Sequence, residues 1–221
     1  MEELARDAAS CVPAGARAIH LHPRDSEGQE TLEADVVDEV VKKVRGACGV
    51  PVGTTTSAEI DPEGRLGLVR AWREPDYASV NLSECGALEL MEALVGIGVG
   101  IEAGVWTVED AKRLAASGLG DRITRILVEP GELQFRDSSG DKGADAVGLV
   151  EDIHGALDEL GLASPRLQHG DGRVTWVLLR DAVRRGLDTR VGLEDTLLDP
   201  DGERTTGNEA LARAAHELGA A

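Results

Sequence analysis

Short apolar runs alternate along the chain with longer stretches whose apolar residues recur at helical spacing. The short runs predict strands ending at residue 20 and over 50–53, 77–80, 99–103, 125–129, 166–169 and 189–192. The longer stretches predict helices over 2–14, 32–45, 64–72, 87–95, 107–117, 144–160, 174–185 and 208–218. Regular alternation of strand and helix is typical of βα units around a parallel sheet.

Two of these helices carry additional signals. The helix over 32–45 has an apolar side made of the valines at positions 36, 37, 40, 41 and 44. Thr107 and Asp110 resemble a capping box at the start of the helix over 107–117, with Asp in the position usually held by Glu. These signals predict helices with one face turned to a core.

Length and composition favour one domain over residues 1–221 with an aliphatic core, because 42% of residues are hydrophobic and only 2% aromatic. No phosphate-binding glycine motif follows any strand, so a nucleotide-binding Rossmann domain has no fingerprint here. The polar residues instead gather where the predicted strands end, which is where parallel barrels keep their chemistry.

Charge and cysteine content restrict partners and location. The formal charge of −18 argues against nucleic acid or an anionic membrane as a partner. No segment approaches the about 20 apolar residues of a membrane span. The acidic start of the chain does not resemble a signal peptide. Three cysteines, widely spaced and without a C-x-x-C pair, are typical of a reducing compartment, so we expect a cytoplasmic protein.

The segment H-L-H-P-R-D, residues 20–25, is the first candidate for chemistry. Side chains alternate along a strand, so His20 and His22 lie on one face and Leu21 on the other. Two imidazoles on one face of a strand end can bind one metal ion. The alternative is a pair of polar residues at a strand end.

The segment R-V-G-L-E-D, residues 190–195, is the second candidate. Arg190 and Glu194 share one face of the strand predicted there. Glu194 could complete a His-His-Glu triad, a common zinc set that leaves one position open for substrate. The alternative is a hydrogen-bonded polar cluster at the mouth of the sheet.

Taken together, H-x-H-P-R-D and R-V-G-L-E-D resemble the β-keto acid cleavage enzymes, a family that includes 3-keto-5-aminohexanoate cleavage enzyme. The resemblance continues at the strand ends between the two motifs and covers nearly the whole chain. It implies an α/β fold of the TIM type, a (β/α)8 barrel, with Zn²⁺ or another divalent metal held by His20, His22 and Glu194. It also implies a homo-oligomer and a small-molecule β-keto acid that is cleaved with acetyl-CoA to give acetoacetate and a new acyl-CoA.

The resemblance further implies roles for other strand-end residues. Arg190 and Asp195 match the charged dyad that removes a proton from the α-carbon of the substrate; the alternative is a structural salt bridge. Thr55 falls where the family commonly has a serine that holds the substrate carboxylate. The full set expected to contact the substrate is Thr55, Thr56, Asn81, Ser83 and Glu102. Asn81 and Ser83 could equally be loop-turn residues, and Glu102 could hold a ligand histidine instead.

The barrel is expected to lack its first strand. Seven strands are predicted and the chain begins with a helix, whereas family members have a strand and loop before the helix that corresponds to residues 1–13. We expect either a native start upstream or two open edges that close on each other or on a partner.

Two other functions compete with this interpretation. A metal-dependent hydrolase of the amidohydrolase type also uses H-x-H on an early barrel strand, but it needs more histidines, and only His169 is left at a strand end. A non-catalytic barrel remnant that binds an acid or a partner chain is the third possibility, and the missing strand is its motivation.

Overall fold

The computed structural model describes residues 1–61, 63–131, 134 and 142–220. Strands and helices alternate along these residues, as their apolar patterns predict. The elements are α1 (Glu2–Cys11), β1 (Ile19–Leu21), α2 (Ala34–Cys48), β2 (Val52–Thr55), α3 (Arg65–Val69), β3 (Tyr77–Asn81), α4 (Ala87–Ile97), β4 (Gly100–Val105), α5 (Val108–Ser117), η1 (Gly120–Arg122), β5 (Arg125–Val128), α6 (Lys142–Glu159), β6 (Arg166–Gln168), η3 (Gly172–Val174), α7 (Thr175–Arg185) and α8 (Asn208–Glu217).

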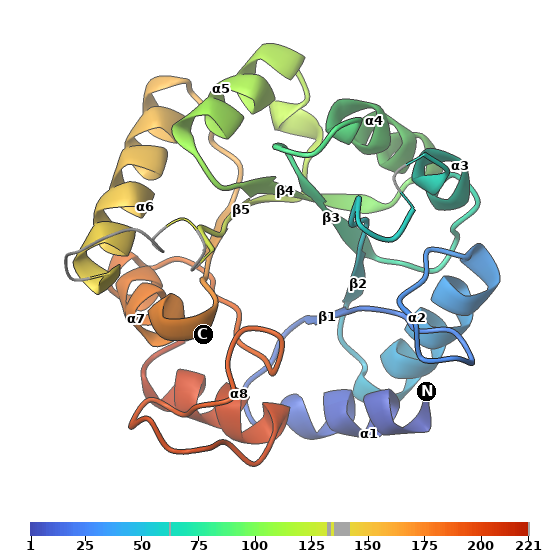
Figure 1. Cartoon of the computed structure of the whole chain (residues 1–221), viewed down its shortest axis with the longest axis horizontal. Coiled ribbons are helices and arrows are strands. Elements are labelled where there is room, and N and C mark those ends of the chain that lie inside the picture. Colours follow the sequence, from blue (N-terminus) through green and yellow to red (C-terminus); the bar gives the residue numbers. More distant parts are fainter. Residues whose placement is uncertain (62, 132–133, 135–141, 221) are drawn as a thin grey trace.

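The strands form one parallel sheet in the order β1-β2-β3-β4-β5-β6, so every strand pairs with its neighbours in the chain. The sheet curls into an incomplete barrel with the helices on its outside (Figure 1). This confirms the predicted fold class, a TIM-type barrel short of strands. The carboxyl ends of all six strands therefore point to one rim, where the polar strand ends gather.

The strand predicted over 189–192 is wrong. Only Asp188 forms a bridge with β6, opposite Leu167, and the Gln168 N–H donates to the Asp188 carbonyl over 2.9 Å. The Thr189 hydroxyl donates to the Gln168 carbonyl over 2.8 Å. Residues 189–192 form no ladder with the described strands.

The first and last helices close the molecule beside this unpaired segment. Helices α1 and α8 pack against each other, and they lie side by side in Figure 1. The Asn208 amide donates to the Asp7 carboxylate over 2.7 Å across this contact. The same asparagine accepts from the Leu193 N–H over 2.8 Å, so it also holds the turn that carries Glu194.

The core is aliphatic, as the composition predicts. The buried side of α2 consists of Val37, Val40, Val41 and Val44, each at most 2% exposed. The predicted capping box at Thr107 is confirmed, with both reciprocal hydrogen bonds present. No helix in the described part of the chain combines the length and the hydropathy that a membrane crossing requires.

One close approach holds β1 in place. The Tyr77 hydroxyl, from β3, reaches across β2 and donates to the Ile19 carbonyl over 2.7 Å. The ring crosses directly over Gly53, where an added Cβ would overlap Cε2 of Tyr77. Gly53 is therefore needed for the contact that positions the strand carrying His20.

Candidate active site

The two motifs at opposite ends of the chain meet at the rim of the barrel. His20 lies on β1, His22 follows its last residue, and Glu194 lies in the turn after the unpaired segment. One ligand atom from each lies within 4.8 Å of the others. The two imidazole rings are 5.3 Å apart at 73° to each other, and His22 Nε2 is 3.4 Å from Glu194 Oε1.

Glu30 sets the orientation of His22. The ring donates from Nδ1 to Glu30 Oε2 over 2.9 Å, which leaves Nε2 directed at Glu194. Arg24 donates to the other Glu30 oxygen over 2.8 Å and to the Gly28 carbonyl over 2.9 Å. A carboxylate behind a histidine is a common support for a metal ligand because it fixes the tautomer and the ring orientation.

His20 and Glu194 are both in the protonation state that metal binding requires. Burial and then the charge of Arg190 hold the pKa of His20 well below its ordinary value, so the ring is neutral. Its Nδ1 is buried and has no hydrogen-bond partner among the described residues. Burial raises the pKa of Glu194, but the hydrogen bond with His22 and the charge of Arg190 outweigh it and lower that pKa. Two imidazoles and one carboxylate with an unpartnered buried nitrogen fit a divalent metal such as zinc.

Arg190 lies behind the triad among three carboxylates. Its Nη2 is 3.6 Å from Glu194, 3.8 Å from Asp195 and 3.8 Å from Glu129. Burial lowers the pKa of Arg190, but these carboxylates, Asp195 first, outweigh it and raise the pKa further above its ordinary value. Arg190 is therefore a fixed cation and does not itself take up or release a proton.

Asp195 is buried at 6% exposure between two cations. One is Arg190, and the other is His169, whose Nδ1 is 3.4 Å from Asp195 Oδ1. On its other side the His169 ring donates from Nε2 to Glu129 Oε2 over 2.9 Å. Burial and Arg190 lower the pKa of His169, but Asp195 and Glu129 outweigh them and raise it to about 9.

Neither His169 nor Glu129 belongs to the two sequence motifs. The structure brings both into the cluster. The signal that could have found them is their position, since each directly follows the carboxyl end of its strand, β5 or β6, on the same rim as His22.

The predicted substrate-binding threonines lie on β2 and in the loop after it. The Thr55 hydroxyl accepts from the Ser57 N–H over 3.0 Å, and the Thr56 hydroxyl donates to the Ser79 carbonyl over 2.8 Å. Both are buried. A buried arginine that sequence reasoning missed, Arg65, donates to the Thr56 carbonyl over 2.9 Å and pairs with Glu84. Arg65 therefore fixes the backbone that presents the two threonines.

Asn81 and Ser83 lie at the end of β3 and in the loop that follows. The Asn81 amide donates to Glu84 over 3.3 Å, within the same loop, and Ser83 is exposed. The contacts of Asn81 are those of a loop-turn residue, and contact with a substrate stays a prediction for both positions.

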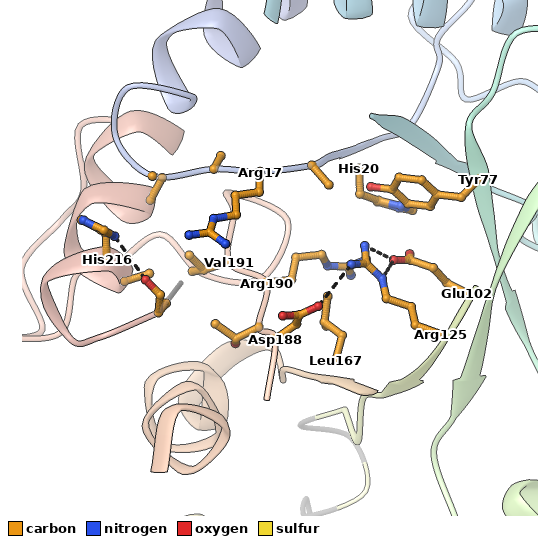
Figure 2. A pocket seen from close by; sticks show the side chains of 17 residues that line it. Arg17, His20, Tyr77, Glu102, Arg125, Leu167, Asp188, Arg190, Val191 and His216 are labelled. Carbon is orange, nitrogen blue, oxygen red and sulfur yellow. Dashed lines mark hydrogen bonds and ion pairs between the residues drawn. The ribbon is translucent and has the colours of Figure 1, made fainter. Parts of the chain in front are cut away.

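Glu102 lies on β4, is 2% exposed and pairs with Arg125 rather than with a histidine. Figure 2 shows Glu102 and Arg125 facing the cavity that His20 and Arg190 also line, with a volume of about 320 Å³. The Arg125 guanidinium lies 5.3 Å from the centre of the Tyr77 ring. Glu102 is thus next to the site, but its carboxylate is already paired with the Arg125 guanidinium.

A second cleft, of about 530 Å³, reaches the triad from the side of α1 and α8. The residues of the triad and the dyad that line it are His20, His22, Arg190, Glu194 and Asp195. A small acid could therefore approach the His20, His22 and Glu194 cluster and the Arg190–Asp195 pair through one opening.

Comparison with protein families gives one match over most of the chain. The family model described as beta-keto acid cleavage enzyme matches residues 1–126 and 143–221. No curated protein matches the sequence significantly.

Solved structures of low identity share the fold. The apo structure of ObcA superposes with a TM-score of 0.76 at 18% identity, and the match covers 98% of this chain and 60% of that one. Dihydropteroate synthase from Thermus thermophilus in complex with 6HMPPP gives 0.54 at 17% identity, covering 99% and 87%. FabK from Thermotoga maritima gives 0.50 at 14% identity, covering 83% and 52%. These likenesses concern the fold alone, and the present chain spans 60% of the length of ObcA.

Proposed function

Since the chain belongs to the β-keto acid cleavage enzyme family, we propose that it converts a β-keto acid and acetyl-CoA into acetoacetate and a new acyl-CoA. One observation carries the proposal. The three ligand atoms of His20, His22 and Glu194 lie within 4.8 Å of one another, next to the Arg190–Asp195 pair. A metal triad beside a buried carboxylate is suited to removing a proton α to a carbonyl, because it supplies a Lewis acid and a base side by side.

His20, His22 and Glu194 would hold the metal, most simply Zn²⁺, with one position left for the substrate. When bound, the metal supplies Lewis acidity toward the keto oxygen, which lowers the cost of removing the α-proton. Glu30 keeps His22 in the tautomer that leaves Nε2 free for the metal.

Asp195 accepts the α-proton of the β-keto acid. The guanidinium of Arg190, with Nη2 3.8 Å from Asp195 Oδ1, lies beside this carboxylate as a cation. Asp195 follows Glu194 directly in the chain, so the base lies beside the triad without being one of the proposed ligands. Thr55, Thr56, Asn81 and Ser83 are proposed to hold the carboxylate end of the substrate, and Glu102 is proposed to contact the substrate elsewhere.

The remaining steps, from the deprotonated β-keto acid to the two products, need only acetyl-CoA as the second reactant. The α-carbon attacks the thioester carbonyl of acetyl-CoA and the CoA thiolate leaves. The thiolate adds to the original keto carbon of the substrate, and the bond between that carbon and the α-carbon breaks. The electron pair stays on the α-carbon of the departing acetoacetate, which takes back the proton held by Asp195. The other fragment leaves as the new acyl-CoA.

The rival functions have less support. The amidohydrolase alternative receives none from the comparisons, and the non-catalytic alternative does not account for a buried base next to a metal triad. A hydrolase would act without CoA, and a remnant would bind without turnover.

The test is a screen of β-keto acids on zinc-loaded protein, with and without acetyl-CoA, following acetoacetate and acyl-CoA by mass spectrometry. We expect both products only when acetyl-CoA is present. Metal is measured in parallel, with about one equivalent expected in the wild type and a large loss in a His20→Ala, His22→Ala double variant. Full metal content in that variant, or products without CoA, would contradict the proposal.

A further inference from the structure

We infer that His169 is a positioning residue that holds the Asp195 carboxylate beside the metal triad through Nδ1, while Glu129 fixes the opposite side of its ring. The inference rests on the proposed role of Asp195 as the base. It concerns a residue to which neither motif assigns a role.

The backbone alone already fixes the position of His169. It directly follows β6, and its backbone N–H donates to the Val128 carbonyl of β5 over 3.1 Å. The side chain is 4% exposed, so a polar ring here must find partners within the protein.

Both ring nitrogens face carboxylates. Nε2 makes a 2.9 Å hydrogen bond to Glu129 Oε2, and Nδ1 lies 3.4 Å from Asp195 Oδ1. Nδ1 is buried and makes no hydrogen bond of good geometry with the described residues. Asp195 is the acceptor within reach, so a small movement of the aspartate completes the bond.

Glu129 acts as the fixed end of this chain of contacts. Its Oε1 accepts from the Trp106 indole N–H over 3.1 Å, while its Oε2 accepts from His169. With Nε2 committed to Glu129, the ring has only Nδ1 to offer to the base. The order Trp106, Glu129, His169 and Asp195 thus runs from the outside of the cluster to the reacting end.

Arg190 alone could not hold Asp195 in one place. It is shared among Glu129, Glu194 and Asp195 at distances that differ by only 0.2 Å, between 3.6 and 3.8 Å. A protonated His169, favoured by its pKa of about 9, is a second cation between Glu129 and Asp195. It gives Asp195 a partner of its own and leaves Arg190 free to face Glu194.

Two substitutions separate the two sides of the ring. The amide nitrogen of His169→Asn lies near the place of Nδ1, whereas that of His169→Gln lies near the place of Nε2. If His169 positions Asp195, His169→Asn keeps kcat within about threefold, whereas His169→Gln and His169→Ala lose about tenfold or more with KM little changed. Equal kcat in His169→Asn and His169→Gln, once both are shown to be folded, would overturn the inference.

A matched control comes from His154, a second buried histidine whose Nε2 bonds Gln168 over 2.8 Å away from the cluster. His154→Gln keeps that contact and should leave kcat unchanged. A loss of kcat in His154→Gln as large as that in His169→Gln would mean that general damage to the fold, not the contact with Asp195, lowers the rate.

The second readout does not depend on turnover. In protein labelled with ¹⁵N-histidine, Asp195→Asn should shift the Nδ1 resonance of His169, and Glu129→Gln should shift Nε2 instead. An Nδ1 resonance unmoved by Asp195→Asn would overturn the inference whatever the activity. If that shift is present but the wild type cleaves no β-keto acid, the proposed function fails and the contact is supported.

Discussion

Raising the pH through the titration of His169 should destabilise the protein by a measurable amount. The pKa of this ring in the folded chain is raised to about 9 from 6.5, since Asp195 and Glu129 outweigh burial and Arg190. A raised pKa means that the stabilisation is fully present below pH 6.5 and is lost as the pH rises through 9. The difference of about 2.5 pKa units corresponds to about 3 kcal/mol of unfolding free energy.

The His169→Asn variant isolates this contribution. The asparagine cannot take up a proton, so the difference between the wild-type and variant unfolding free energies should shrink by about 3 kcal/mol between pH 6 and pH 10. His22, whose pKa is also raised by its hydrogen bonds to Glu194 and Glu30 against burial, titrates in both proteins and cancels in the difference.

Urea unfolding in the presence of a chelator, repeated across this pH range, measures the effect. His154→Gln is the control. Burial lowers the pKa of His154, so that ring is neutral in both states over the upper part of the range, where His169 loses its proton, and its removal should leave the pH dependence there unchanged. Parallel curves of unfolding free energy against pH for the wild type and His169→Asn would refute the electrostatic account of the cluster.

Three further predictions concern the base, the metal support and the strand that carries it. Asp195→Asn should reduce acetoacetate release by about 100-fold or more while the metal content stays at the wild-type level; near-normal release would rule out the base. Glu30→Gln should weaken metal binding by about 10- to 100-fold, because His22 loses its fixed tautomer, and an unchanged dissociation constant would exclude that support. Gly53→Ala should cost about 1–3 kcal/mol in urea unfolding through its overlap with a tyrosine ring, whereas Gly46→Ala, with open space in α2, should gain up to about 1 kcal/mol; the reverse order would show that the overlap relaxes freely.

The sheet and most of the candidate site follow from local patterns. Apolar periodicity located the six strands, and parallel strands bring their carboxyl ends to one rim, so His20 and His22 could be expected at that rim. Glu194 joins them there from a turn, although the strand predicted before it does not form. The alternating residues after Asp188 predict a strand, but among the described residues only Asp188 bridges to β6, a pairing that local periodicity does not determine.

The supporting residues could not be found in this way. Glu30 meets His22 because a short turn folds back, with Arg24 bridging to Glu30. Arg65 reaches the Thr56 carbonyl from α3, the helix that follows that loop. Such contacts depend on the packing of loops and side chains, which leaves no periodic trace in the sequence. His169 had a strand-end position as its signal, but its partners come from two other segments.

The origin of the carbon atoms in acetoacetate tests the central claim most directly. Zinc-loaded protein is given an unlabelled β-keto acid and acetyl-CoA with ¹³C at both acetyl carbons. The proposed reaction joins the labelled acetyl group to the α-carbon and carboxylate of the substrate, so acetoacetate must carry two adjacent labels at its methyl and keto carbons, and the new acyl-CoA must carry none. Unlabelled acetoacetate, or labelled carbon in the new acyl-CoA, would contradict the account.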